Sequence, residues 1–244
     1  MIIHWLMTAA LAQSSTWMDL PVCQDDASTC ETIYTTQPRP TRNPALLRFT
    51  DPEFANPKWV PLHVIRLLDP STSENVQLAL ITILQQSDIT AVENKLLPLF
   101  QADSPELRVG MAELLPNLTP DGQTQVLPIL LTDVDWLVRA QTVRVVARHL
   151  GNSHPEILKK GITDTHAAVR LHAVKGLGWN DVHVSLDQLT PLLQDEDANV
   201  RLHTIRTIDR LYPGSAVKLG LLDTLLDDRD PKVQREILRI KTAY

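Results

Sequence analysis

The sequence predicts an all-α, right-handed solenoid of about six two-helix repeats, preceded by an irregular N-terminal segment. The first observation is a repeating anchor: Val138, Val169 and Val200, each followed by arginine, are 31 residues apart. Related dipeptides continue this spacing back to Val76 and forward, after 33 residues, to Val233. The second observation is a Leu-rich segment before each anchor. Because only 5% of the residues are aromatic, the core must come from Leu, Val, Ile and Ala. Self-similarity at a fixed period of this size is typical of stacked helical repeats.

Composition excludes several other classes of protein. The chain has 244 residues, of which 43% are hydrophobic and 21% charged, which is enough apolar surface to exclude full disorder. No apolar run approaches the ~18 residues that a membrane-spanning helix needs. The net charge of −6 does not favour attraction of the whole molecule to nucleic acid. Eight glycines argue against Gly-rich phosphate loops.

The first twelve residues resemble a secretory signal. They are mostly apolar and end in Ala10-Leu11-Ala12, an A-x-A pattern that precedes the polar Gln13. We therefore expect cleavage before Gln13 and a periplasmic or secreted mature protein. The positively charged n-region of such signals is missing, because no Lys or Arg precedes Arg39. The alternative is an uncleaved N-terminus and a cytoplasmic location.

Two cysteines follow the predicted cleavage site. Cys23 and Cys30 are close in sequence, and an even count in an exported chain predicts one disulfide. The alternatives are two free thiols or half of a metal site, but no His lies nearby to complete a tetrahedral set. Residues 13–56 are polar and interrupted by proline, which predicts an extended segment before a repeat domain at 57–244.

Each repeat is predicted to contain a Leu-rich first helix, an acidic turn and a second helix that begins just before the anchor. Prolines in the first helices, at 98, 128 and 191, predict that these helices are short or kinked. An aspartate five residues before the anchor suits a turn or a helix N-cap. Four repeats carry it: Asp133, Asp164, Asp195 and Asp228.

This combination of a turn aspartate, a Val-Arg anchor and a Leu-rich partner helix resembles the HEAT repeat, and the short period resembles its phycobilisome-lyase-type subgroup. The resemblance covers about residues 59–244. It implies a HEAT-like α-solenoid whose second helices line the concave side. The first repeat departs from the pattern with Ser71 and Gln77, and the last with Gln234, as is common for terminal repeats.

A helix turns about 100° per residue, so anchor positions +0, +4, +5 and +8 share one face. In the third to fifth repeats that face carries Val, Ile, Leu and Ala together with Thr142 and Thr204, and it is expected to be buried. The arginine after each anchor lies on the same side and is expected to meet the turn carboxylates, within its own repeat or the next. The expected structural ladder consists of Asp133, Arg139, Asp164, Arg170, Asp195 and Arg201.

The opposite face of the second helices becomes basic from the third repeat onward. We interpret it as a surface for a protein partner, with an acidic surface or peptide favoured and with Trp179 covering an apolar part of it. The alternative is a solvated helix face on which each charge contributes little. Two of its members, His172 and His203, suggest a pH-sensitive or metal-binding pair, although duplication of the repeat also explains them. The candidate partner-binding residues are Arg144, Arg148, His172, Lys175, Trp179, His203, Arg206, Arg210 and Arg239.

Motifs for nucleophilic, metal or nucleotide chemistry are missing, including Gly-x-Ser-x-Gly, the phosphate loop and His-Glu-x-x-His. We therefore expect a non-catalytic HEAT-repeat scaffold or adaptor with no catalytic residue, cofactor, metal or small-molecule substrate and with no membrane span in the mature chain. Two alternatives remain. One is a lyase-type or other HEAT-like enzyme subunit, and the other is a nucleic-acid-binding HEAT-like protein.

Overall fold

A computed structural model of the protein describes residues 59–244. The predicted signal peptide at 1–12, the segment 13–56 and the predicted Cys23–Cys30 disulfide lie outside the described residues. Within 59–244 the chain forms twelve α-helices and no strand, as the all-α solenoid class requires. The chain divides into two units between Ile129 and Leu130, and each is described by itself below.

Unit 1 is built of short helices around an aliphatic core. Leu67, Leu84, Leu96, Phe100 and Met111 are fully buried there. Helix α4 contacts α5, and α5 in turn contacts α7. The elements are α4 (Val60–Leu68), α5 (Glu74–Leu84), α6 (Glu93–Leu96), the 3₁₀ turn η3 (Leu97–Gln101), α7 (Pro105–Ala112) and the 3₁₀ turn η4 (Leu115–Asn117). Helix α8 (Pro120–Leu131) contains the boundary between the units.

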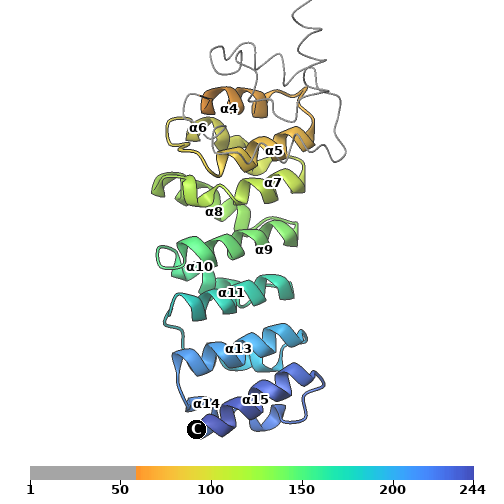
Figure 1. Ribbon diagram of the computed structural model, residues 1–244, viewed down its shortest axis with the longest axis vertical. Coiled ribbons are helices and arrows are strands. Elements are labelled where there is room, and N and C mark those ends of the chain that lie inside the picture. Colours follow the sequence, from red (N-terminus) through yellow and green to blue (C-terminus); the bar gives the residue numbers. More distant parts are fainter. Residues whose placement is uncertain (1–58) are drawn as a thin grey trace, which may run out of the picture. The chain divides into compact units, whose positions relative to one another are not determined.

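Unit 2 places its second helices side by side. Helices α9, α11, α13 and α15 follow one another in this order, each in contact with the next (Figure 1). The elements are α9 (Trp136–Val145), continued by a π-helical turn η5 (Val146–Leu150), α10 (Pro155–Gly161), α11 (Ala167–Trp179), α12 (Leu186–Leu189), η6 (Thr190–Gln194), α13 (Ala198–Leu211), α14 (Ser215–Lys218), η7 (Asp223–Leu225) and α15 (Pro231–Ala243).

Proline shortens two of the first helices, as predicted. Helices α6 and α12 contain only four residues, and each continues as a 3₁₀ turn whose second residue is Pro98 or Pro191. Proline has no N–H to donate, and its ring clashes with the carbonyl four residues earlier. Pro128, in contrast, lies inside α8.

The predicted buried stripe is confirmed. The anchor valines Val138, Val169 and Val200 are at most 1% exposed. The residues four, five and eight positions after each of these three anchors are buried as well. The hydrophobic period therefore sets which side of each second helix faces the core.

No helix among residues 59–244 is long and apolar enough to cross a membrane.

Candidate binding face on the second helices

A ladder of ion pairs positions the second helices of unit 2. Each anchor arginine reaches the turn aspartate of the next repeat and binds both of its carboxylate oxygens. The Nε and Nη2 atoms lie 2.9 and 3.1 Å from the carboxylate oxygens in Arg139–Asp164, 2.6 and 2.9 Å in Arg170–Asp195, and 2.7 Å in both bonds of Arg201–Asp228. Such bidentate pairs fix the relative orientation of the two side chains and also neutralise their charges.

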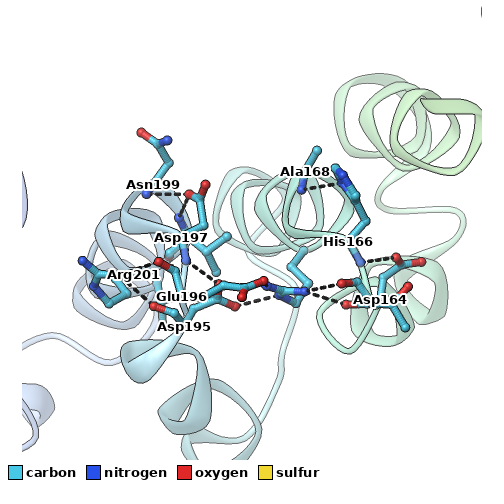
Figure 2. A network of polar contacts seen from close by, with 12 residues as sticks. Asp164, His166, Ala168, Asp195, Glu196, Asp197, Asn199 and Arg201 are labelled. Carbon is cyan, nitrogen blue, oxygen red and sulfur yellow. Dashed lines mark hydrogen bonds and ion pairs between the residues drawn. The ribbon is translucent and has the colours of Figure 1, made fainter. Parts of the chain in front are cut away.

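The same arginines also donate hydrogen bonds to backbone carbonyls in the turns of their own repeats. The Nη1 atom of Arg170 donates to the carbonyl oxygen of Asp164 at 2.9 Å, and Arg201 donates to that of Asp195 at 2.8 Å. Figure 2 shows this network between the turns of Asp164 and Asp195. Gln234, which replaces the arginine in the last repeat, donates to the Asp228 carbonyl at 2.6 Å. The amide of Gln234 thus supplies the hydrogen bond within its own turn that the arginines supply in the other repeats.

The ladder shifts the pKa values of its members. Hydrogen bonds from Arg201 hold the pKa of Asp228 below its usual value. Burial acts most strongly on Asp195 and would raise its pKa, but hydrogen bonds from Arg170 and from the Asp197 N–H outweigh it and lower the pKa. The aspartates therefore stay ionised at neutral pH, and the pKa of Arg201 rises in turn because of its bond to Asp228.

The N-caps differ from the prediction by two residues. The side chains of Asp135, His166, Asp197 and Asp230 accept the first helical N–H groups of α9, α11, α13 and α15. The turn aspartates accept instead the N–H of these capping residues; the distance from Asp164 to His166 is 2.8 Å. The turn aspartates bind the arginine of the preceding repeat and the N–H of the capping residue, so the residue two positions later caps the helix.

The structure brings the candidate partner-binding residues onto one series of neighbouring helices. Arg144 and Arg148 lie on α9 and η5, the residues from His172 to Trp179 on α11, His203, Arg206 and Arg210 on α13, and Arg239 on α15. Arg148, Trp179, Arg206, Arg210 and Arg239 are exposed, whereas Arg144, His172, Lys175 and His203 are partly buried.

Three cations on this face, Arg206, Arg210 and Arg239, pair with carboxylates. The distance from a guanidinium nitrogen to a carboxylate oxygen is 3.3 Å in Arg206–Glu236, 2.8 Å in Arg210–Asp181 and 3.1 Å in Arg239–Asp209. The sequence analysis did not foresee these pairs, because each partner comes from a neighbouring repeat. The repeat spacing itself is the signal, since each pair is separated by 29 or 30 residues.

The other end of the face, on η5 and α11, has a different character. The Lys175 ammonium lies 5.1 Å from the centre of the Trp179 ring, and the Trp179 side chain is 49% exposed. Arg148 is exposed and forms no ion pair within residues 59–244. The Arg144 Nε donates to Gln141 at 2.9 Å. A cation, an accessible aromatic ring and a second cation thus lie on adjacent helices.

The position of Trp179 depends on close helix packing. The following residue, Asn180, donates its side-chain amide to the carbonyls of Ala147 and Gly176, both at 2.8 Å. A Cβ atom on Gly176 would lie only 2.7 Å from the Ala147 Cβ, so glycine allows α11 to approach η5 this closely. The indole is therefore held by rigid backbone on two repeats.

The two histidines of the face are neutral at pH 7. Burial, and then the charges of Lys175, Arg144 and Arg148, lower the pKa of His172 to about 4. Burial and the charges of Lys175 and Arg206 lower the pKa of His203 to about 4 as well, against the opposing effect of Glu236. Within 59–244 no group of three or more His, Cys, Asp or Glu side chains is arranged to hold a metal ion.

The fold and the ladder define an α-solenoid repeat protein. The family model for HEAT repeats matches residues 124–209 and 155–240. Residues 124–240, a region that includes nearly all of unit 2, are therefore HEAT repeats. The match concerns HEAT repeats in general and does not assign the phycobilisome-lyase-type subgroup.

A solved structure of similar fold supports the solenoid architecture. The Escherichia coli protein YibA is similar with 18% identity and a TM-score of 0.59, over 84% of this chain and 76% of that chain. A designed armadillo repeat protein, solved in complex with the peptide (KR)4, shares 15% identity over 75% of this chain and 98% of its own, with a TM-score of 0.46. No curated protein matches the chain in sequence.

Proposed function

We propose that this protein is a non-catalytic HEAT-repeat scaffold that binds an acidic segment of a protein partner on the face formed by η5 and α11. The observation that carries the proposal is the division of charge along the face. Arg148 and Lys175 form no ion pair within the described part of the chain, whereas Arg206, Arg210 and Arg239 are each paired. An acidic segment therefore finds cations without competing carboxylates only at the η5–α11 end.

Trp179 gives this end of the face an apolar anchor. A half-exposed indole beside a cation offers area for an aromatic or aliphatic side chain, and such anchors contribute more to binding than exposed charges do. Charge brings an acidic partner to the face and orients it, while the indole slows its release. The paired arginines on α13 and α15 limit the acidic stretch to a short segment.

Charge reversal tests the proposal. The variant Arg148→Glu/Lys175→Glu is compared with Lys159→Glu/Lys218→Glu, which changes the net charge equally but places the substitutions on α10 and α14 instead of η5 and α11. The probe is a fluorescein-labelled decapeptide of glutamates with one central leucine, and fluorescence anisotropy reports its binding. We expect the first variant to weaken binding by about tenfold or more, the loss of two charge-assisted contacts, with helicity unchanged. Equal affinity of both variants would contradict the proposal.

We also propose that the protein acts outside the cytoplasm. The support is the apolar start of the sequence with its Ala10-Leu11-Ala12 pattern and the closely spaced Cys23 and Cys30. Intact-mass measurement of protein made with its complete N-terminus is expected to show loss of residues 1–12 and one disulfide. A full-length chain with two free thiols would overturn this part of the proposal.

A further inference from the structure

The start of α9 carries exposed apolar side chains that the stacking of repeats does not use. Val134, Trp136 and Leu137 are 95%, 39% and 49% exposed. Every other repeat has small, polar or proline residues at these positions; in the next two repeats they are Thr165, Ala167, Ala168, Glu196, Ala198 and Asn199. The fold therefore does not require large apolar groups here, and exposed apolar side chains that cluster are typical of a surface that contacts a partner.

The turn that presents this cluster, called here the 134–137 cluster, is held in place by the neighbouring repeat. The indole of Trp136 stacks on the ring of His166 in the next turn, with the ring centres 3.8 Å apart and the planes inclined by 11°. The Nη1 atom of Arg139 donates to the carbonyl oxygen of Asp133 at 2.8 Å. A partner that binds the cluster therefore has little ordering of this turn to offset.

The charge around the cluster is acidic. The turns at the starts of α9, α11 and α13, residues 133–137, 164–168 and 195–199, contain no Lys or Arg. Figure 2 shows that the turns carrying His166 and Asp197 lie next to each other. The carboxylates of the three turns are Asp133, Asp135, Asp164, Asp195, Glu196 and Asp197.

The hydrogen bonds in these turns favour a cation over an anion. A free helix N-terminus attracts anions, but the side chains of Asp135, His166 and Asp197 already accept the first N–H groups of α9, α11 and α13. Arg139 and Arg170 bind the turn carboxylates of the ladder. Within residues 59–244, Asp135 and Asp197 accept only backbone N–H groups and form no ion pair. Their charges can therefore pair with a cation of a partner.

We propose that the 134–137 cluster binds a segment of a protein partner in which an arginine stands next to a leucine. The planar guanidinium stacks on the exposed part of the Trp136 indole and pairs with the Asp135 carboxylate, a geometry that arginine provides better than lysine. The leucine of the partner packs against Val134 and Leu137. The apolar and the acidic groups of the cluster are thus both used by one short segment.

This surface is distinct from the η5–α11 end of the face, and the inference does not depend on the function proposed for that end. Trp136 and Arg148 are twelve residues apart on α9 and η5, about 18 Å along the helix axis. The protein thus holds segments of opposite charge at opposite ends of the same helices.

A peptide with two Arg-Leu pairs between Gly-Ser ends, labelled with fluorescein, tests the proposal by fluorescence anisotropy. We expect saturable binding with a Kd below ~0.1 mM. The variant Trp136→Ala/Leu137→Ala introduces the residues that the next repeat has at these positions, and it is expected to weaken binding by about tenfold or more because the aromatic anchor is lost. Its control is Leu238→Ala, which removes an exposed leucine from α15 and is expected to bind like the wild type.

The charge component is tested separately. Asp135→Asn retains an N-cap, since asparagine caps helices as well as aspartate does, but removes the carboxylate. We expect binding of the peptide to weaken by about threefold at low salt, as one exposed ion pair predicts. The matched control is Asp230→Asn, which has the same capping role at α15 outside the three acidic turns and is expected to bind like the wild type. This comparison remains decisive if the double alanine variant fails to fold.

The acidic peptide that tests the η5–α11 end is expected to bind Trp136→Ala/Leu137→Ala as it binds the wild type, so failure at one surface is distinguished from failure at the other. The inference is overturned if the Arg-Leu peptide shows no saturable binding, if the folded double variant binds it like Leu238→Ala, or if Asp135→Asn binds it like Asp230→Asn. Sedimentation that shows dimers of the wild type but not of the double variant would also overturn it, because a second copy of the chain would then occupy the cluster.

Discussion

The pair between Arg201 and Asp228 is the most buried step of the ladder and is expected to be its most sensitive point. The two side chains are only 5% and 4% exposed. Removal of the carboxylate in Asp228→Ala leaves the guanidinium buried beside α15 without its partner. The expected result is a large loss of stability in the last hairpin of the array, formed by α14 and α15.

The expected loss of stability in Asp228→Ala follows from the hydrogen bonds that the substitution removes and those that Arg201 keeps. Asp228 accepts two bonds of 2.7 Å from Arg201 and one of 2.8 Å from the Asp230 N–H. Breaking a buried pair from one side costs ~3–5 kcal/mol. Arg201 keeps its bonds to the carbonyls of Asp195 and Glu196, at 2.8 and 3.2 Å. These bonds place the expected cost at the lower end, about 3 kcal/mol.

Hydrogen exchange of the α15 amides measures this cost locally. A loss of about 3 kcal/mol corresponds to roughly two orders of magnitude faster exchange. The neighbouring Asp227→Ala removes an exposed carboxylate from the same turn and is the control. The double variant Arg201→Met/Asp228→Leu is expected to recover most of the stability, because an apolar pair needs no charge compensation. Exchange in Asp228→Ala as slow as in Asp227→Ala would refute the reasoning.

Three other perturbations extend the test. Between pH 6.5 and about 4, His172 and His203 are protonated in the unfolded chain but not in the folded chain. The contribution of these histidines to the free energy of unfolding is therefore fully present above pH 6.5 and is lost as the pH falls toward 4. Urea unfolding of a variant with both histidines changed to Asn is expected to show a flatter dependence of stability on pH. Val169→Asp places a charge in the core and is expected to unfold its repeat and weaken the neighbours, seen as lost helicity on heating. Gly161→Ala forces α10 away from Ala173 and is expected to cost ~1–3 kcal/mol, measured by chemical denaturation, despite the higher helix propensity of alanine.

Periodicity made most of the fold predictable from the sequence. The spacing of Val138, Val169 and Val200 places each valine on the same side of its helix, and all three are buried. Pro98 and Pro191 likewise predicted short first helices, because the loss of an N–H donor is a local property, whereas Pro128 lies inside the twelve-residue α8. The turn aspartates were found, but their partners were left open between the same repeat and the next.

The ion pairs on the candidate face could not be predicted from the sequence. Arg206, Arg210 and Arg239 look as available in the sequence as Arg148 does, yet the first three bind carboxylates of neighbouring repeats. The rotation between successive repeats decides which side chains meet, and a linear pattern does not contain that rotation.

The sequence by itself determined the class of fold, the register of the second helices and the spacing of the ladder, because these depend on short-range hydrophobic period and on residue type. Only the tertiary structure decided which cations of the candidate face pair with carboxylates of neighbouring repeats. Those outcomes depend on distances of a few ångströms between helices of neighbouring repeats, and small shifts in packing set them.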